Sequence, residues 1–313
     1  MDKQKLIILT GPTAVGKTAL SLELAKRINA EIISADSMQV YRHMDIGSAK
    51  IMPDQMQGIR HHLIDVLDPS ESFNVCRFQT LAKEALREIA GRGKLPLIVG
   101  GTGFYIQALL YDIDFSEEDS NGAYRKMLEE KAKEGGAHAL YEMLLAVDQK
   151  SAENIHENNV KRVIRALEYH HDTGKKISEH NEEERSKESP YDFRYFVLTD
   201  DRKRIYENID RRVDEMMKKG LLNEVMRLKE MGYTPGLVSM QGLGYKELMQ
   251  HLEGAYDLKR AVSLIKQNTR HYAKRQMTWF RRERDVIFIE KAGRSTEELV
   301  RELMKYITDF KTT

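Results

Sequence analysis

The sequence predicts an α/β fold: a parallel sheet of the phosphate-binding-loop (P-loop) type with helices on both faces, plus an inserted all-helical domain. Three observations lead to this prediction. Short, nearly unbroken apolar runs alternate with helical segments, which is typical of a buried parallel sheet. The first of these runs leads directly into a glycine-rich loop. Between about residues 113 and 185 the strand-like runs disappear and helical patterns dominate.

Five short apolar runs are expected to form the strands of one sheet. They span residues 6–9, 31–36, 95–99, 193–198 and 286–289. Helical patterns follow the first run from Lys17 to Asn29 and the third run as far as Tyr111. Because strands and helices alternate, we expect parallel strands whose carboxyl ends meet at one edge of the sheet, where such folds bind ligands.

The middle of the chain predicts an inserted helical domain. Its helical segments span 124–134, 137–147 and 160–171, and the strongly polar stretch 178–189 is expected to be a connection. We therefore expect an α/β core made of residues 1–112 and 186–313, with residues 113–185 as the insertion.

Length and composition bound the class of protein. A chain of 313 residues is expected to form about two domains, and its 41% apolar residues suffice for a sizeable core. The formal net charge of +1 gives no argument for a polyanionic partner, so local basic segments must carry it. A single cysteine excludes an internal disulfide and fits a reducing compartment. Because no run of about 18 apolar residues occurs and the charged residues 1–5 lead directly into a strand-like run, we expect no membrane span, no signal peptide and a cytoplasmic protein. We also expect a monomer.

A phosphate site is predicted where the first strand ends. The residues that fit the pattern G-x-x-x-x-G-K-[ST] are Gly11, Pro12, Thr13, Ala14, Val15, Gly16, Lys17 and Thr18. The glycines allow backbone N–H groups to converge on phosphate oxygens, the next helix adds its dipole, and Lys17 supplies a positive charge. The Thr18 hydroxyl is placed to bind Mg²⁺. The alternative is an incidental glycine turn.

After the phosphate loop, this chain lacks the acid-tipped strand that is typical of phosphoryl-transfer enzymes. Enzymes that hydrolyse a nucleoside triphosphate or move its γ-phosphoryl group usually have a second apolar strand that ends in a Mg²⁺-binding Asp. Here the run 95–99 ends in glycines, and Asp65 follows only two apolar residues. This departure argues against phosphoryl transfer without deciding the question.

Two further segments are expected at the same edge of the sheet. Asp36 ends the second predicted strand, where it is placed to act as a general base, and Ser37 and Gln39 are placed to hydrogen-bond a base edge. The alternative for Asp36 is a helix N-cap. Gly100-Gly101-Thr102-Gly103 follows the third predicted strand and brings the Thr102 hydroxyl to this edge, although a tight strand-to-helix turn is the alternative.

Basic residues add two hypotheses. Arg204 and Arg211 share one helical face, from which they would bind a leaving diphosphate, whereas a solvated face is the alternative. The segment 259–284 holds nine Lys or Arg and one acid, and we expect one face of it to bind a polyanion such as RNA. The basic residues expected to take part there and in the insertion are Lys266, Arg270, Lys274, Lys161, Arg162 and Arg165. A solvated helix is again the alternative.

Seven segments, taken together, resemble those of the tRNA dimethylallyltransferase family. They are GPTAVGKT (11–18), SADSMQVYR (34–42), HHLID (61–65), GGTGFY (100–105), RALE (165–168), QGLGYKE (241–247) and QNTRHYAKRQ (267–276). The match covers nearly the whole chain, and the combination is far more specific than the phosphate loop alone.

The resemblance implies transfer of a dimethylallyl group from its diphosphate to the N6 amine of the adenosine just 3′ of the anticodon in tRNA. The P-loop and Mg²⁺ would hold the diphosphate leaving group. Because no phosphoryl group would move, the Mg²⁺-binding Asp that usually ends a second strand would not be needed. Asp36 corresponds to the general base, and Thr102 and Arg211 would stabilise the charge on the departing diphosphate. The residues implied to bind tRNA are Asp36, Ser37, Met38, Gln39, Thr102, Arg125, Asn159, Val160, Lys161, Arg162, Val163, Ile164, Arg165, Gln241, Gly242, Leu243, Gly244, Tyr245 and Lys246.

The insertion departs from the family pattern at three positions. Gln149, Glu157 and Lys176 stand where the family has proline, so looser turns are expected there.

Three other functions stay open. They are a prenyltransferase acting on free adenine nucleotides, a small-molecule kinase, and a nonenzymatic RNA-binding module. The insertion and the basic segment favour tRNA, and the phosphate loop argues against a module without catalysis.

Overall fold

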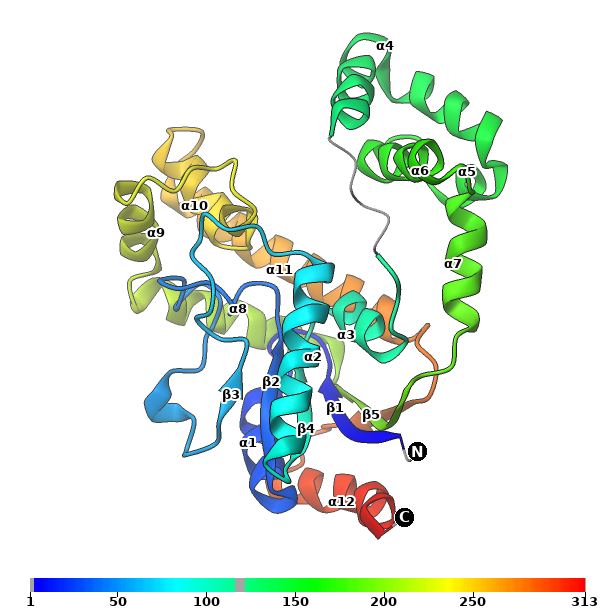
Figure 1. The fold of residues 1–313 in the computed structure, drawn as a ribbon. Coiled ribbons are helices and arrows are strands. Elements are labelled where there is room, and N and C mark those ends of the chain that lie inside the picture. The colour runs from blue at the N-terminus through cyan, green and yellow to red at the C-terminus, as the bar shows by residue number, and fades with distance from the viewer. Residues whose placement is uncertain (1–2, 116–121, 313) are drawn as a thin grey trace. The chain divides into compact units, whose positions relative to one another are not determined.

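The structure, a computed structural model, describes residues 3–115 and 122–312 and contains one parallel sheet of six strands (Figure 1). The strands are β1 (Gln4–Thr10), β2 (Ala30–Ala35), β3 (His61–His62), β4 (Leu95–Gly100), β5 (Tyr191–Thr199) and β6 (Val286–Glu290). Their spatial order is β3-β2-β4-β1-β5-β6. All five predicted strands are confirmed. The sequence analysis did not predict β3, because this strand has only two residues and contains no apolar run.

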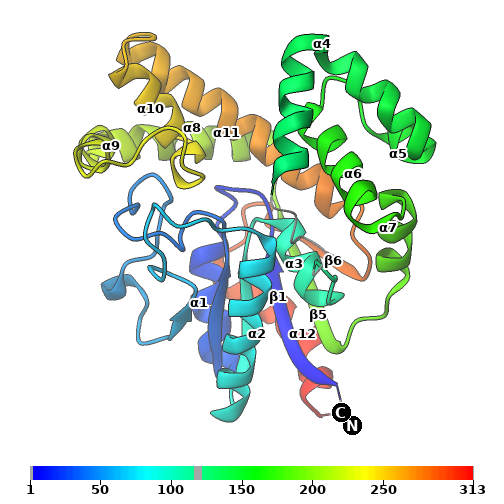
Figure 2. The same ribbon diagram turned by 45° about the horizontal axis from the view of Figure 1, so that its top comes forward.

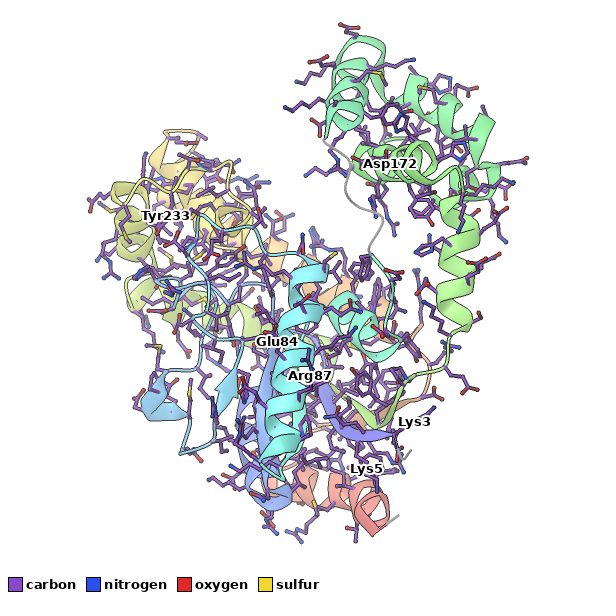
Figure 3. All side chains as sticks on the ribbon, in the orientation of Figure 1. Lys3, Lys5, Glu84, Arg87, Asp172 and Tyr233 are labelled. Atoms are coloured by element: carbon purple, nitrogen blue, oxygen red, sulfur yellow. The ribbon has the colours of Figure 1, made fainter. Side chains whose placement is uncertain are left out.

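Helices cover both faces of the sheet, as the sequence predicted. The helices α1 (Lys17–Ile28) and α12 (Thr296–Thr312) lie on one face, and α2 (Val75–Gly91) lies on the other (Figure 1). Residues in strands alternate between faces, so Ile7 and Leu9 of β1 share a core with α1 and α12. On α2, Leu86 is buried, while Glu84 and Arg87 extend into solvent (Figure 3).

Four of the remaining core helices lie beyond the carboxyl ends of the strands. Helices α8 and α11 pack against each other there, and α10 packs against α9 and α11 (Figure 2). The bounds are α3 (Gly103–Leu110), α8 (Arg202–Lys218), α9 (Leu221–Glu230), α10 (Tyr245–Leu252) and α11 (Leu258–Phe280), with short 3₁₀ helices η1 (Pro53–Gln55) and η2 (Ser239–Gln241). This arrangement places α8 and α11 over the loops that follow β1, β2 and β4.

Residues 110–190 form a second compact unit, where the sequence predicted an insertion spanning 113–185. Its helices are α4 (Ala123–Val147), α5 (Gln149–Asn154), α6 (Val160–Thr173) and α7 (Ile177–Ser186). Helix α4 is interrupted by non-helical backbone at Gly136, close to the predicted gap between two helices. Leu128, Leu144 and Val163 belong to the core of this unit.

Helix α7 corrects the prediction of a connection over 178–189. Few apolar residues mark this helix, and its first turn is held from a distant part of the chain. The buried Asp148 carboxylate accepts hydrogen bonds from the backbone N–H and hydroxyl of Ser178, at 2.9 and 2.7 Å, and from both corresponding groups of Ser151. Although burial opposes it, these hydrogen bonds hold the pKa of Asp148 below its ordinary value. A contact across 30 residues leaves no periodic signal in the sequence.

Candidate active site

The P-loop curls between β1 and α1 as its glycines allow. Gly11 has φ 145°, and a side chain there would place its Cβ less than 3.0 Å from the carbonyl oxygen of Leu198 in β5. Gly16, at the N-cap of α1, has φ 107°, and Ala14 also adopts a positive φ of 63°. Among the described residues, none accepts a hydrogen bond from the N–H groups of Ala14, Val15 or Gly16. Free donors at a helix N-terminus are the arrangement that binds anions in proteins.

Lys17 is folded back over this loop. Its Nζ donates hydrogen bonds to the carbonyl oxygens of Gly11 and Pro12, both at 2.9 Å. Burial and the nearby positive charge of Arg212 lower the pKa of Lys17 to about 7, while Asp36 acts in the opposite direction. The lysine therefore lies close to two other charged groups, and an arriving anion would favour its protonated form.

Thr18, the predicted Mg²⁺ ligand, has a hydroxyl that is free to bind a metal shared with a substrate phosphate. It lies exposed in the first turn of α1, and no hydrogen bond engages its hydroxyl in the described structure. Magnesium in such sites takes one or two protein oxygens, with phosphate oxygens and water completing the shell. Within residues 3–115 and 122–312, no cluster of three or more His, Cys, Asp or Glu side chains offers a separate metal site.

Asp36 lies directly after β2 and caps a turn rather than a helix, so the N-cap alternative is wrong. Its Oδ1 accepts the backbone N–H groups of Met38 at 2.8 Å and Gln39 at 3.3 Å. Its Oδ2 accepts no hydrogen bond from the described residues. Burial raises the pKa of Asp36, against the two backbone hydrogen bonds and the charges of Lys17 and Arg212. One carboxylate oxygen is therefore free in a desolvated site, which suits a general base.

Thr102 is brought to Asp36 by the close approach of β4 and β2. A Cβ on Gly100 would lie less than 3.0 Å from the backbone of Ala35, the residue before Asp36. The Thr102 N–H donates to the Ala35 carbonyl oxygen at 3.2 Å, and α3 starts at the next residue. The predicted functional position and the tight-turn alternative are thus both present in one structure.

Arg211 is exposed, whereas its neighbour Arg212 is partly buried, with its charge close enough to affect Lys17 and Asp36. The Arg211 guanidinium donates to Asn208 Oδ1 at 2.6 Å, and only the Asn208 amide reaches the loop, at the Ala14 carbonyl oxygen. The charge of Arg212, by contrast, affects the pKa of both Lys17 and Asp36. Burial lowers the pKa of Arg212, while Glu215 and Asp36 act against this. The predicted role of Arg211 at the diphosphate stays a prediction, and Arg212, on the same helix, is a second candidate for it.

The two segments predicted to hold the base lie against each other. A Cβ on Gly242 would meet the Met38 side chain at less than 3.0 Å, so the glycine allows this contact. Gln39 is directed toward the chain after it, with its Nε2 3.4 Å from the Ala49 carbonyl oxygen. Gln241 and Lys246 are exposed, and the Gln241 amide contacts the Pro235 carbonyl oxygen.

Tyr245 belongs to the scaffold of this region, because its side chain is fully buried. Its hydroxyl donates to Glu224 at 2.7 Å, and Glu224 also accepts the backbone N–H groups of Asp45, Ile46 and Gly47. Lys50 ties the same loop to Asp65, so this acid has a structural partner. These contacts fix the course of the chain that follows Asp36.

The basic face of α11 is partly neutralised by α8. Lys266 pairs with Asp214 at 2.6 Å, and Arg270 pairs with Asp210. Lys274 instead lines a surface hollow of about 390 Å³ on α11. The other residues around this hollow are His271, Arg275, Thr278, Trp279 and Arg282.

In the insertion, the residues predicted to bind tRNA divide by burial. Lys161 and Arg162 are exposed on α6, whereas Val163 and Ile164 are buried in the core of the unit, so their side chains do not face a ligand. Arg125 forms a two-point ion pair with Glu168, at 2.9 and 2.6 Å. Asn159 precedes α6 as its N-cap residue but makes no side-chain capping bond.

Three residues of the site had no assigned role in the sequence analysis. Tyr272 is partly buried; desolvation, with the charge of Asp36 adding to it, raises its pKa to about 12, and its hydroxyl contacts Thr102 and Gln276. Gln276 donates to Gly101 and accepts from Thr13. Lys291, just after β6, contacts the Val15 carbonyl oxygen at 3.3 Å. Tyr272 and Gln276 lie in the QNTRHYAKRQ segment, which was the one available signal for them.

In the described parts of the chain, every helix is too short or too polar to cross a membrane.

Comparisons with known proteins identify the family of the chain. The family model "IPP transferase" matches residues 39–283, and the model "Isopentenyl transferase" matches residues 4–70. A tRNA dimethylallyltransferase of Lachnoclostridium phytofermentans is 59% identical over 307 residues, which are 98% of either chain.

Solved structures give the same result. The tRNA isopentenylpyrophosphate transferase of Bacillus halodurans is 43% identical with a TM-score of 0.75, and the match covers 98% of this chain and 96% of that one. The corresponding Staphylococcus epidermidis enzyme is 42% identical, with a TM-score of 0.73 and coverage of 98% and 100%. A eukaryotic dimethylallyltransferase acting on tRNA is 32% identical, with a TM-score of 0.80 and coverage of 92% and 74%. The chain therefore belongs to the IPP transferase family of tRNA dimethylallyltransferases.

Proposed function

We propose that this enzyme transfers a dimethylallyl group from dimethylallyl diphosphate to the N6 amine of the adenosine 3′-adjacent to the anticodon in tRNA, and releases diphosphate. One observation carries the proposal. A partly buried carboxylate with a free oxygen, that of Asp36, lies beside a phosphate-binding loop, close enough for the charges of Asp36 and Lys17 to affect each other's pKa. A base and a site for an anionic leaving group are thus adjacent, as such a substitution requires.

The reaction needs one bond to form, one to break and one proton to move. The N6 nitrogen attacks C1 of the dimethylallyl group while the bond from C1 to the diphosphate oxygen breaks, and the diphosphate leaves with that electron pair. Asp36 Oδ2 takes the proton from N6. This help matters because the amine lone pair is delocalised into the purine, so proton loss during attack favours reaction.

The leaving diphosphate is held by the loop and by two cationic side chains. The free N–H groups of Ala14, Val15 and Gly16 would bind its oxygens, and Lys17 and Arg212 would balance its charge. We give Arg212 the role that the sequence analysis gave to Arg211, because the charge of Arg212 affects the pKa of both Lys17 and Asp36. Fixed donors aimed at a developing charge act on the transition state.

Mg²⁺ fits the free hydroxyl of Thr18, which would hold the ion together with diphosphate oxygens. When bound, the ion neutralises part of the charge on the leaving group. Thr102, which is held beside the end of β2, contributes its hydroxyl near the same reacting groups.

The tRNA would be held at two places. The adenosine must leave the anticodon stack to reach Asp36, and the segments 36–39 and 241–246 would surround the extruded base. The exposed cations Lys161 and Arg162 on α6 would bind the phosphates of the anticodon stem-loop. We further propose that the enzyme acts as a monomer in the cytoplasm.

The proposal is tested by offering the purified enzyme labelled dimethylallyl diphosphate with Mg²⁺ and, in parallel, unmodified tRNA, AMP or ATP. Label in tRNA alone, at the adenosine next to the anticodon, is the expected result. Label in free nucleotide would instead show a prenyltransferase of free nucleotides. ATP consumption with a small acceptor and no transfer of label would show a kinase and refute the proposal.

A further inference from the structure

Gln276 of α11 joins the phosphate-binding loop to the Gly100–Thr102 turn through a single side-chain amide. Its Oε1 accepts the backbone N–H of Thr13 at 2.9 Å, and its Nε2 donates to the carbonyl oxygen of Gly101 at 2.9 Å. The side chain is only 5% exposed. Both bonds cross large sequence distances, of 263 and 175 residues, so neither serves α11 itself.

The two segments that Gln276 joins need an added connection. Strands β1 and β4 pair as far as Thr10 and Gly100, which are adjacent in the parallel register, and the Thr10 hydroxyl also donates to the Gly100 carbonyl oxygen at 2.7 Å. Beyond this pair the two chains leave the sheet in separate loops. The amide of Gln276 uses one donor and one acceptor to join the two loops, as the next peptide of a ladder would.

Gly101 shows that the space is reserved for this amide. A Cβ at this position would lie less than 3.0 Å from Gln276 Nε2, while the contacts with Gln276 Cδ at 3.5 Å and the Gly11 carbonyl oxygen at 3.7 Å are ordinary. Gly101 is not among the residues with positive φ, so its backbone does not require glycine. The absence of a side chain at position 101 is therefore explained by Gln276.

Helix α11 also contacts the groups on the reacting side of the site. One turn before Gln276, Tyr272 contacts Thr102, and the charge of Asp36 affects its pKa. Ala273 is buried against Ala14 of the loop. Since Gln276 occupies the Thr13 N–H, the loop presents the N–H groups of Ala14, Val15 and Gly16 to an anion.

We infer that Gln276 is a positioning residue. It fixes the distance from the diphosphate in the loop to two groups, the Asp36 carboxylate and the Thr102 hydroxyl. The inference rests on the proposed function, because the distance matters only if the leaving group occupies the loop. Removing the amide would leave the phosphate-facing N–H groups in place. Their distances from the Asp36 carboxylate and the Thr102 hydroxyl would then vary more. Small misplacements of this kind lower the rate of the chemical step more than they lower affinity.

The first test compares Gln276→Leu with Gln4→Leu. Gln4 is a matched control, because its Nε2 also joins two elements, at the Leu86 carbonyl oxygen, but at the opposite end of β1. We expect Gln276→Leu to lower kcat about 10- to 100-fold and to change the Kd for diphosphate by less than about threefold. An equal loss of kcat in both variants, or a loss of affinity that matches the loss of kcat, would overturn the inference.

The second test uses the contact with Gly101. Gly101→Ala displaces the amide, so Gly101→Ala, Gln276→Ala and the double variant should have nearly the same kcat, within about threefold. Multiplying losses would show that the two residues act independently and would overturn the inference. In Gln276→Glu the bond to Gly101 returns only when the carboxyl is protonated, so its kcat relative to wild type should recover as the pH falls, whereas that of Gln276→Leu should not.

A third readout needs no prenyl transfer. The Thr13 amide proton is protected by Gln276, so in Gln276→Leu it should exchange with solvent at least about tenfold faster, while amides within α1 stay unchanged. Unchanged exchange at Thr13 would overturn the inference even if kcat falls. If wild-type enzyme labels no tRNA, the proposed function fails, and the positioning role fails with it even where exchange at Thr13 confirms the bridge.

Discussion

Replacing Asp36 by Asn separates its chemistry from its structural role. The Asn side chain keeps an oxygen at the position of Oδ1, so the hydrogen bonds from Met38 and Gln39 remain. Only the free oxygen loses its ability to take a proton. Losing a positioned general base costs about 10²- to 10⁴-fold in rate, which corresponds to about 3 to 5 kcal/mol of transition-state stabilisation. We expect kcat for prenyl transfer to tRNA to fall within this range.

The assay measures single-turnover transfer of labelled dimethylallyl groups to tRNA, with the Kd for diphosphate from calorimetry. Because the substitution removes a negative charge close to Lys17, diphosphate should bind Asp36→Asn as tightly as wild type or more tightly. A variant that keeps more than about a tenth of the wild-type kcat would refute the assignment of Asp36 as general base. Parallel losses in kcat and diphosphate affinity would instead show that the site had been distorted.

The same substitution has a predicted effect on stability. Burial raises the pKa of Asp36 above its ordinary value, so the folded state favours the protonated carboxyl. This contribution to the free energy of unfolding is fully present below the ordinary pKa and is lost as the pH rises through the raised pKa. At neutral pH the charged carboxylate therefore destabilises the fold, and Asp36→Asn should unfold at the same or a higher temperature than wild type. Activity and stability would then change in opposite directions.

Three further predictions concern the loop, the arginines and the insertion. Because the pKa of Lys17 is lowered to about 7, diphosphate binding above that pH should take up a proton, which calorimetry in buffers of different ionisation enthalpy detects; Lys17→Met should abolish the uptake, and an unchanged uptake contradicts the assignment. Arg212→Ala should lower kcat about 10²- to 10³-fold and Arg211→Ala only a few-fold, and the reverse order in the same transfer assay would restore Arg211. Asp148→Ala should lower the free energy of unfolding of the inserted unit by about 3 kcal/mol, measured by denaturation and by exchange of the α7 amides. The lowered pKa of Asp148 means that its contribution is present above the ordinary pKa and lost as the pH falls through the lowered value, so the loss on substitution should disappear in acid.

The parts of the site that sequence reasoning located are those with local signals. The P-loop has a fixed spacing, follows a buried strand and opens a helix, so its backbone conformation follows from neighbouring residues. Asp36 and Thr102 were located because parallel strands end at one edge, and β2 and β4 are adjacent in the structure. For these residues the topology alone brings the groups together.

The parts that sequence reasoning missed depend on packing between distant segments. Arg211 and Arg212 lie on a helix whose rotation about its own axis is set by buried side chains such as Ile205 and Ile209, so a seven-residue spacing leaves the choice between neighbours open. Helix α7 was missed because the buried Asp148 holds its first turn from 30 residues away. Gln276 has no local pattern at all, since its two partners lie in other motifs.

A common cause connects the residues found only in the structure. Arg212 lies on α8, and Tyr272 and Gln276 lie on α11, the two helices that pack together beyond the carboxyl ends of the strands. The sheet edge supplies the loop, Asp36 and Thr102, but each of these sits at the end of a different strand. Residues from α8 and α11 contact them from outside the sheet, and Gly101 leaves the space that one such contact requires. In the proposed reaction, the strand ends would therefore provide the reacting groups, and the two helices would set the distances between them.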